Sequence, residues 1–108
     1  MKIFLDDERK APKGWIPVRW PQDAINLLKN NQVEIISLDH DLGNDSKGTG
    51  YDVILWIEEQ VALGKMLPPV IRVHSANSSA KQKMISGINS INRLANKINS
   101  KNFQHNTK

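Results

Sequence analysis

Short apolar runs alternate along this chain with segments whose apolar residues recur at helical intervals. Four of the runs, each followed by polar or turn-forming residues, have the length of β-strands. The expected strands cover residues 2–7, 15–20, 33–38 and 70–75. Apolar residues three and four positions apart predict amphipathic helices over about residues 21–31, 51–63 and 78–99. The predicted order is therefore strand, strand, helix, strand, helix, strand, helix.

The alternation of strands and helices predicts the fold class. Two strands joined by a helix run parallel, and such crossover connections are right-handed. We therefore expect a three-layer α/β fold, with about three helices and a short parallel sheet of four strands in the order 2-1-3-4. Pro17 lies in the second apolar run, which suits a strand at the edge of the sheet.

Polar residues follow three of the expected strands at the point where each strand ends. These groups are Asp6-Asp7-Glu8, Asp39-His40-Asp41 and His74-Ser75-Ala76-Asn77. The three strands are neighbours in the order 2-1-3-4, and the carboxyl ends of parallel strands meet at one edge of a sheet. The sequence therefore predicts a site at this edge, assembled from three separate strands.

The predicted site holds up to four carboxylates, from Asp6, Asp7, Asp39 and Asp41. Like charges at short range repel each other unless a proton or a divalent cation neutralises them. Clusters of oxygen ligands favour hard ions, so Mg²⁺ or Mn²⁺ is the expected metal. The alternative is a structural role, in which single aspartates cap turns or pair with Arg9, Arg19 or Lys81.

Two histidines, His40 and His74, lie at the ends of neighbouring strands. Imidazole transfers protons near neutral pH and also binds transition metals. Asp41 or Asp39 could fix the tautomer of one ring. A pair of histidines could act on a phosphodiester, one deprotonating water and the other protonating the leaving oxygen. A hydrogen-bonded structural role is the alternative for either ring.

The start of the last expected helix suits a phosphate group. Ser75 and Asn77 offer a hydroxyl and an amide there, and Ser78 or Ser79 can cap the helix, whose free N–H groups attract anions. Lys81 lies in the first turn, where a cation opposes the helix dipole unless it faces an anion. We expect it to contact phosphate, with a solvated lysine as the alternative.

Composition bounds the protein class, and the charge distribution adds to the picture of the site. The chain has 108 residues, enough for one domain, with no cysteine and no apolar run long enough to span a membrane, so we expect a cytoplasmic protein.

All 11 acidic residues lie within 6–59, whereas residues 60–108 hold eight Lys and Arg and no acid. A basic face suits a phosphate ligand or RNA. The alternative is a solvated helix with a loose tail, and we expect residues 100–108 to be a basic, disordered tail outside the domain 1–99.

The combination of motifs resembles a known family. Acids after the first strand, Asp39 after the third and Ser75-Ala76 after the fourth resemble the receiver domain of two-component signalling. More specifically, the chain resembles the cyclic-phosphate processing receiver-like family, a shortened relative with a flavodoxin-like fold. The matching motifs are D-D-E-R at 6–9, G-W at 14–15, L-D-H-D-L-G at 38–43, G-T-G-Y-D at 48–52 and V-H-S-A-N at 73–77.

The resemblance implies a role for each matching position. Metal ligands would be Asp6, Asp7 and Asp39, and catalytic residues would be His40, Asp41 and His74. The expected phosphate- and substrate-binding residues are Arg9, Ser75, Asn77 and Lys81. The chain departs from the family after Asn77, where Pro and then Gly-Arg are usual and Ser78, Ala80 and Lys81 stand here. Lysine keeps the charge of arginine but not its bidentate geometry.

These observations predict a metal-assisted phosphoesterase that acts on cyclic nucleotides or on the 2′,3′-cyclic phosphate ends of RNA. RNA binding would use the basic C-terminal half of the chain. Two alternatives from other classes remain. One is a non-catalytic module that sequesters cyclic nucleotides. The other is a degenerate receiver that acts as an interaction domain, although the pattern for a fifth strand with its lysine is missing after Val73.

Overall fold

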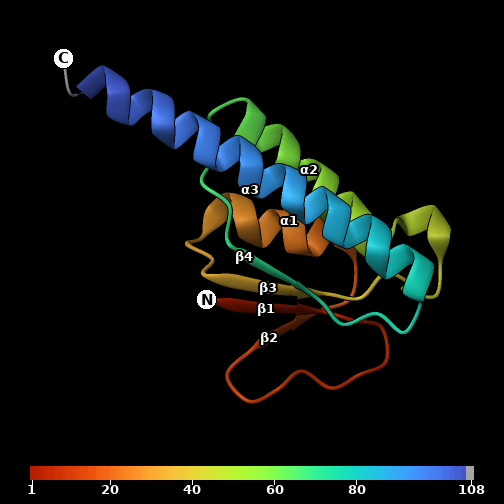
Figure 1. Cartoon of the computed structure of the whole chain (residues 1–108). Helices are drawn as coiled ribbons and strands as arrows, with labels where there is room; N and C mark the ends of the chain where they lie inside the picture. Colours follow the sequence, from red (N-terminus) through yellow and green to blue (C-terminus); the bar gives the residue numbers. More distant parts are fainter. Residues whose placement is uncertain (107–108) are drawn as a thin grey trace.

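The computed structural model describes the backbone of residues 1–106 and the side chains of residues 1–98. It contains a four-stranded sheet and three α-helices (Figure 1). The strands are β1 (Lys2–Leu5), β2 (Ile16–Val18), β3 (Ile35–Leu38) and β4 (Val70–Val73). The helices are α1 (Pro21–Asn30), α2 (Gly50–Ala62) and α3 (Ser78–Asn106), with a short 3₁₀ turn, η1 (Asp45–Lys47).

The sheet is parallel throughout, in the order β2-β1-β3-β4. This confirms the predicted receiver-like α/β class, strand order and helix number. Residues at matching positions form rows across the central strands, and one such row is Leu5, Leu38 and Val73. Leu5 and Leu38 are fully buried against the helices. Side chains one residue further along therefore point to the opposite face of the sheet, because direction alternates along a strand.

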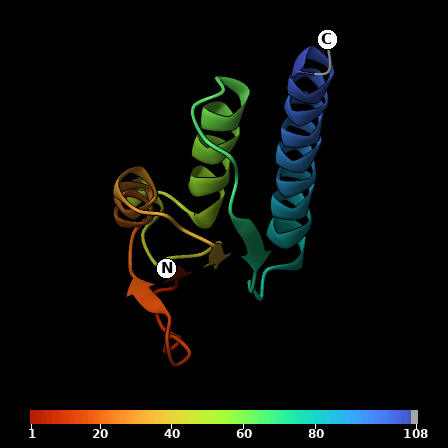
Figure 2. The same cartoon turned by 90° about the vertical axis from the view of Figure 1, so that its left-hand side faces the viewer.

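All three helices lie on one face of the sheet (Figure 2). α1 connects β2 to β3 and α2 connects β3 to β4, so both crossovers run toward the β4 edge of the sheet. Right-handed crossovers that run in the same direction place their helices on the same face of the sheet. The connection between β1 and β2 is a loop rather than a helix, so no helix covers the other face within the described chain. The layering therefore differs from the expected three layers, because the molecule has one layer of helices and one of strands.

The core lies between the sheet and the helix layer. α2 is the central helix and packs against both α1 and α3. The largest fully buried side chains come from the sheet, the segment after β3, α2 and α3, and they are Ile3, Leu5, Ile36, Leu38, Leu42, Val53, Ile54, Ile57, Val61, Met84 and Ile91. These apolar contacts fix the positions of the strand ends that carry the polar residues.

Helix boundaries follow local signals closely at α2. A capping box at Thr49 and Asp52 starts this helix, and Gly64, with φ of +71°, follows its end. The last helix continues past the boundary expected near Ser100, because α3 reaches Asn106. Residues 107–108 lie outside the described residues, and the disordered basic tail over 100–108 stays a prediction.

None of the described helices combines the length and apolar character needed to cross a membrane.

Candidate functional site

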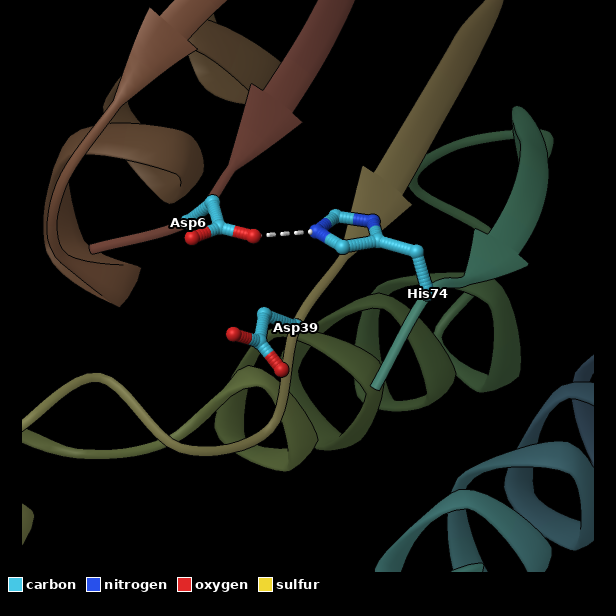
Figure 3. Close-up of side chains that lie close together, drawn as sticks. All are labelled: Asp6, Asp39 and His74. Atoms are coloured by element: carbon cyan, nitrogen blue, oxygen red, sulfur yellow. Dashed lines mark hydrogen bonds and ion pairs between the residues drawn. The ribbon is translucent and has the colours of Figure 1, made fainter. Parts of the chain in front are cut away.

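Three side chains from neighbouring strands form a row at the carboxyl edge of the sheet. Asp6, Asp39 and His74 each follow the last residue of their strands, one position beyond the row of Leu5, Leu38 and Val73. The backbone N–H of Asp39 donates to Leu5 O at 2.9 Å and that of His74 to Leu38 O at 3.0 Å, so the ladder extends into this row. Each residue offers one ligand atom within 4.8 Å of the other two (Figure 3).

Asp6 is held in its charged form by donors on both carboxylate oxygens. Its Oδ1 accepts the N–H groups of Glu8 and Arg9, both at 2.8 Å, and its Oδ2 lies 2.9 Å from His74 Nε2. Burial opposes ionisation, but the two backbone donors and His74 outweigh it and lower the pKa of Asp6. The Asp6 carboxylate is therefore charged and fixed in orientation.

Asp39 has the opposite electrostatic environment. Burial and then the neighbouring charge of Asp6 raise the pKa of its carboxyl group, despite an N–H donated by His40 to Oδ1 at 2.8 Å. Two carboxylates in one row repel each other unless a cation or a proton lies between them. This pair therefore favours the binding of a cation.

His74 has hydrogen-bonding contacts at both ring nitrogens. Its Nδ1 lies 2.7 Å from Ser37 Oγ, and its Nε2 lies 2.9 Å from Asp6 Oδ2. The ring also stacks on Phe4, with centroids 4.3 Å apart and planes 3° from parallel. The side chain is therefore fixed on three sides. Sequence reasoning missed Ser37, although a hydroxyl in an otherwise apolar strand, two residues before Asp39, was a usable signal.

His40 and Asp41 form a second pair beside this row. His40 Nδ1 lies 2.8 Å from Asp41 Oδ1, and this hydrogen bond lowers the pKa of Asp41. Asn77 Nδ2 approaches the other oxygen of Asp41 at 3.5 Å. Within the described part of the chain, no hydrogen bond is made by His40 Nε2. That nitrogen is therefore the one available for proton exchange with a ligand.

Asp7 lies apart from the group formed by Asp6, Asp39 and His74. Its Oδ2 is 3.7 Å from Arg19 Nη1, and a side chain at Gly43 would come within 3.3 Å of the same oxygen. Asp7 lies in the bend that follows β1, and it lines the same cavity as Asp6 and Asp39 without joining their row. Of the three expected metal ligands, the structure brings together Asp6 and Asp39, with His74 as the third group.

The residues expected to bind phosphate have different surroundings. Asn77, rather than the predicted Ser78 or Ser79, caps α3, because its Oδ1 accepts the N–H of Ala80 at 3.1 Å. Ser75 Oγ accepts the N–H of Asn77 at 3.1 Å and stabilises the turn before the helix. Arg9 is exposed and donates from Nη1 to the carbonyl of His74. Lys81 is exposed in the first turn of α3.

A cavity of about 270 Å³ opens at this edge of the sheet. Its lining joins the three strand ends, and the lining residues are Asp6, Asp7, Glu8, Arg9, Asp39, Asp41, Gly43 and Ala76. Asp41 lines this cavity, and His40, which is not in the lining, is hydrogen-bonded to Asp41. Carboxylates dominate the lining and Arg9 is its one cationic side chain among the described residues, which suits a metal-bound phosphate group better than a free anion.

The lowered pKa of Asp6 gives a testable pH dependence of stability. A folded-state pKa below the ordinary value of 3.8 means that Asp6 stabilises the protein above that pH and loses this contribution as the pH falls. In metal-free protein, the free energy of unfolding of Asp6→Asn should therefore fall less steeply below about pH 4 than that of the wild type. Urea unfolding between pH 6 and 3 measures this, and parallel curves for the variant and the wild type would contradict it.

Comparison with known proteins places the chain in a family. The family model described as the cyclic-phosphate processing receiver domain matches residues 1–90, and the chain belongs to this family. A search of curated proteins gave no match, and a search of solved structures gave none either. The matched residues include all the strands and the whole carboxyl edge of the sheet. The family description links the chain to cyclic-phosphate processing.

Proposed function

We propose that this protein is a metal-assisted phosphoesterase that opens the cyclic phosphate of a nucleotide or of an RNA 3′ end. The observation that carries the proposal is the row of Asp6, Asp39 and His74 together with the His40–Asp41 pair, because Asp6, Asp39 and Asp41 line one cavity. The row offers ligands for a divalent cation, and the pair offers a group for proton transfer. The family supports a cyclic phosphate as the substrate.

The two carboxylates and the imidazole fit a divalent cation by their chemistry. Two of the three donors are anionic, and Asp39 has no cationic partner within 4 Å among the described residues. When bound there, a divalent ion would withdraw negative charge from the phosphoryl oxygens. Arg9 lies in the same lining and would compensate the remaining phosphate charge.

Proton transfer is assigned to His40. Its contact with Asp41 fixes a hydrogen on Nδ1 and leaves Nε2 as the acceptor, the form that a general base needs. His40 would take a proton from water as the oxygen of water bonds to phosphorus. The bond from phosphorus to one ring oxygen breaks at the same centre, and the leaving oxygen takes its proton from solvent. The ring of His74 directs Nε2 toward Asp6 and contacts Ser37 through Nδ1, and this orientation supports a ligand role for Nε2 instead.

The test is turnover of a panel of cyclic phosphates by the purified protein. Incubation with 2′,3′-cyclic nucleotides, RNA ending in a 2′,3′-cyclic phosphate and cyclic dinucleotides, with Mn²⁺ or Mg²⁺, should give a phosphomonoester or a linear product. The same mixtures with a chelator should give none. Binding by calorimetry without product would identify a sequestering module and overturn the enzymatic proposal.

Replacing His40 by alanine should lower turnover on the order of a hundredfold, because a positioned general base contributes about that much or more. Asp41→Asn should have a smaller effect, since the ring keeps a hydrogen-bonding partner but loses the charge that fixes its tautomer. The measurement is kcat/KM as a function of pH. The decrease of kcat/KM at low pH that a general base produces should be absent in His40→Ala. A His40→Ala protein with wild-type turnover and pH profile would contradict the assignment.

A further inference from the structure

The row at the carboxyl edge combines two kinds of ligand atom, and this difference bears on which metal it selects. Asp6 and Asp39 offer carboxylate oxygens, whereas His74 offers an imidazole nitrogen at the same point (Figure 3). Mg²⁺ prefers oxygen ligands alone, whereas first-row transition ions accept imidazole readily. A site with one nitrogen among its three protein ligands therefore discriminates between these ions.

We propose that Asp6, Asp39 and His74 form a transition-metal site that selects Mn²⁺ over Mg²⁺ through the Nε2 atom of His74, and that Ser37 positions this imidazole. This inference rests on the proposed function for its relevance to catalysis. It concerns metal choice, however, and is tested by binding alone.

The ligand nitrogen is identified by the contacts of the ring. Nε2 is the nitrogen that lies 2.9 Å from Asp6 Oδ2, so it faces the carboxylates, whereas Nδ1 lies 2.7 Å from Ser37 Oγ. A metal ion close to Asp6 and Asp39 would replace the hydrogen on Nε2. The ring hydrogen would then be on Nδ1 and would be donated to Ser37.

Ser37 suits both forms of the ring, because a hydroxyl group can donate or accept a hydrogen bond. In the metal-free form it donates to Nδ1, and in the metal-bound form it accepts from Nδ1–H. Ser37 is only 8% exposed and lies on β3 two residues before Asp39, on the same face of the sheet. The strand that supplies one ligand therefore also orients another.

Phe4 limits the remaining freedom of the ring. It lies on β1 two residues before Asp6, is 9% exposed, and its ring stacks on that of His74 with 4.3 Å between centroids. Stacking fixes the plane of the imidazole, while Ser37 fixes its rotation within that plane. Such preorganisation lowers the entropic cost of metal binding and favours an ion that accepts nitrogen.

The direct test is the electron spin-echo modulation of Mn²⁺ bound to the wild-type protein without substrate. We expect modulation from one directly bound imidazole ¹⁴N, and calorimetry should give Mn²⁺ a dissociation constant at least about tenfold lower than that of Mg²⁺. Absence of nitrogen modulation would overturn the proposal. This measurement needs no variant and so does not depend on the folding of one.

Matched glutamine variants identify the nitrogen. His74→Gln places a neutral oxygen near the Nε2 position, so the nitrogen signal should be lost and the preference for Mn²⁺ over Mg²⁺ should fall about tenfold. His40→Gln is the control and should change neither. Loss of the signal in His40→Gln, or an unchanged preference in His74→Gln, would overturn the assignment.

Ser37 is tested as a positioning residue by two substitutions. Ser37→Ala should weaken Mn²⁺ binding roughly 10-fold to 100-fold, as is usual when the hydrogen-bonding partner of a metal-bound histidine is removed. Ser37→Thr keeps the hydroxyl and should restore most of the affinity. In the metal-free protein, the ¹⁵N chemical shifts of His74 should differ from the wild-type values in Ser37→Ala and stay close to them in Ser37→Thr. Unchanged affinity and shifts in Ser37→Ala would remove Ser37 from the proposal.

The outcomes separate this inference from the proposed function. Mn²⁺ bound to His74 without turnover of any cyclic phosphate would retain the metal site and reject the phosphoesterase. Turnover supported equally by Mg²⁺ and Mn²⁺, with no bound nitrogen, would retain the enzyme and reject the selective site.

Discussion

Asp39→Asn should lower metal-dependent turnover roughly a thousandfold and at the same time make the metal-free protein more stable at neutral pH. The first effect follows because charge stabilisation by a bound metal contributes several kcal/mol, and each tenfold in rate corresponds to about 1.4 kcal/mol. The second follows from the raised pKa of Asp39, whose causes are burial and the charge of Asp6. Rate and stability therefore change in opposite directions.

The sign of the stability change depends on protonation. A carboxyl group with a folded-state pKa above its ordinary value of 3.8 destabilises the folded protein at higher pH, where it must ionise, and this penalty disappears as the pH falls. An asparagine removes the penalty, so the gain in Asp39→Asn should be present at pH 7 and absent near pH 3. Thermal unfolding in a chelator measures it.

Asp23→Asn provides a matched control, because Asp23 is exposed in the first turn of α1 and lies outside the cavity lining. It should leave turnover unchanged and lower stability slightly through the lost interaction with the helix dipole. An Asp39→Asn protein that keeps wild-type turnover, or that is less stable than the wild type in chelator at pH 7, would contradict the assignment of Asp39.

Gly50→Ala should destabilise the protein by about 3 kcal/mol or more, which is the upper range for overpacking a buried position. A Cβ atom at this position would lie 1.8 Å from the carbonyl oxygen of Asp39. The N–H of Gly50 also donates to the carbonyl of His40 at 3.1 Å, so the two backbones cannot separate without losing this hydrogen bond. The start of α2 therefore sets the position of the strand end that carries Asp39.

Thermal unfolding followed by circular dichroism measures this effect, and we expect the midpoint to fall by more than about 10 °C for a domain of this size. Gly14→Ala is the control, since nothing lies within 4 Å of a Cβ atom there and only the φ of +87° opposes alanine. That strain should cost about 1 kcal/mol. Equal unfolding midpoints for Gly50→Ala and Gly14→Ala would show that the close backbone approach at Gly50 does not limit stability.

The sequence predicted which strand ends meet, because the relevant signals are local. Apolar runs that end in Asp6, Asp39 and His74 mark three strands, and the helices between strands make them parallel. Pro17 marked the edge strand β2 correctly. The distinctive motifs were also enough to identify the family, which the match over residues 1–90 confirms.

The sequence did not predict which side chains share a face beyond each strand end. Asp6 and Asp7 were grouped together, but Asp7 lies in a bend beside Arg19, and His74 is the third member of the row. The contact between His74 and Ser37 joins residues 37 positions apart and depends on the register of β3 and β4. No local pattern specifies that register.

Thus the sequence by itself determined the elements, the parallel sheet and the acids and histidines at its carboxyl edge. Local periodicity, capping and turn residues carry that information within short segments. The single layer of helices (Figure 2) follows from the predicted strand order and right-handed crossovers, although we expected three layers. Only the tertiary structure decided that His74 lies between Ser37 and Asp6. The reason is that the register between strands depends on the packing of the whole sheet, and one residue of register reverses the face of every side chain.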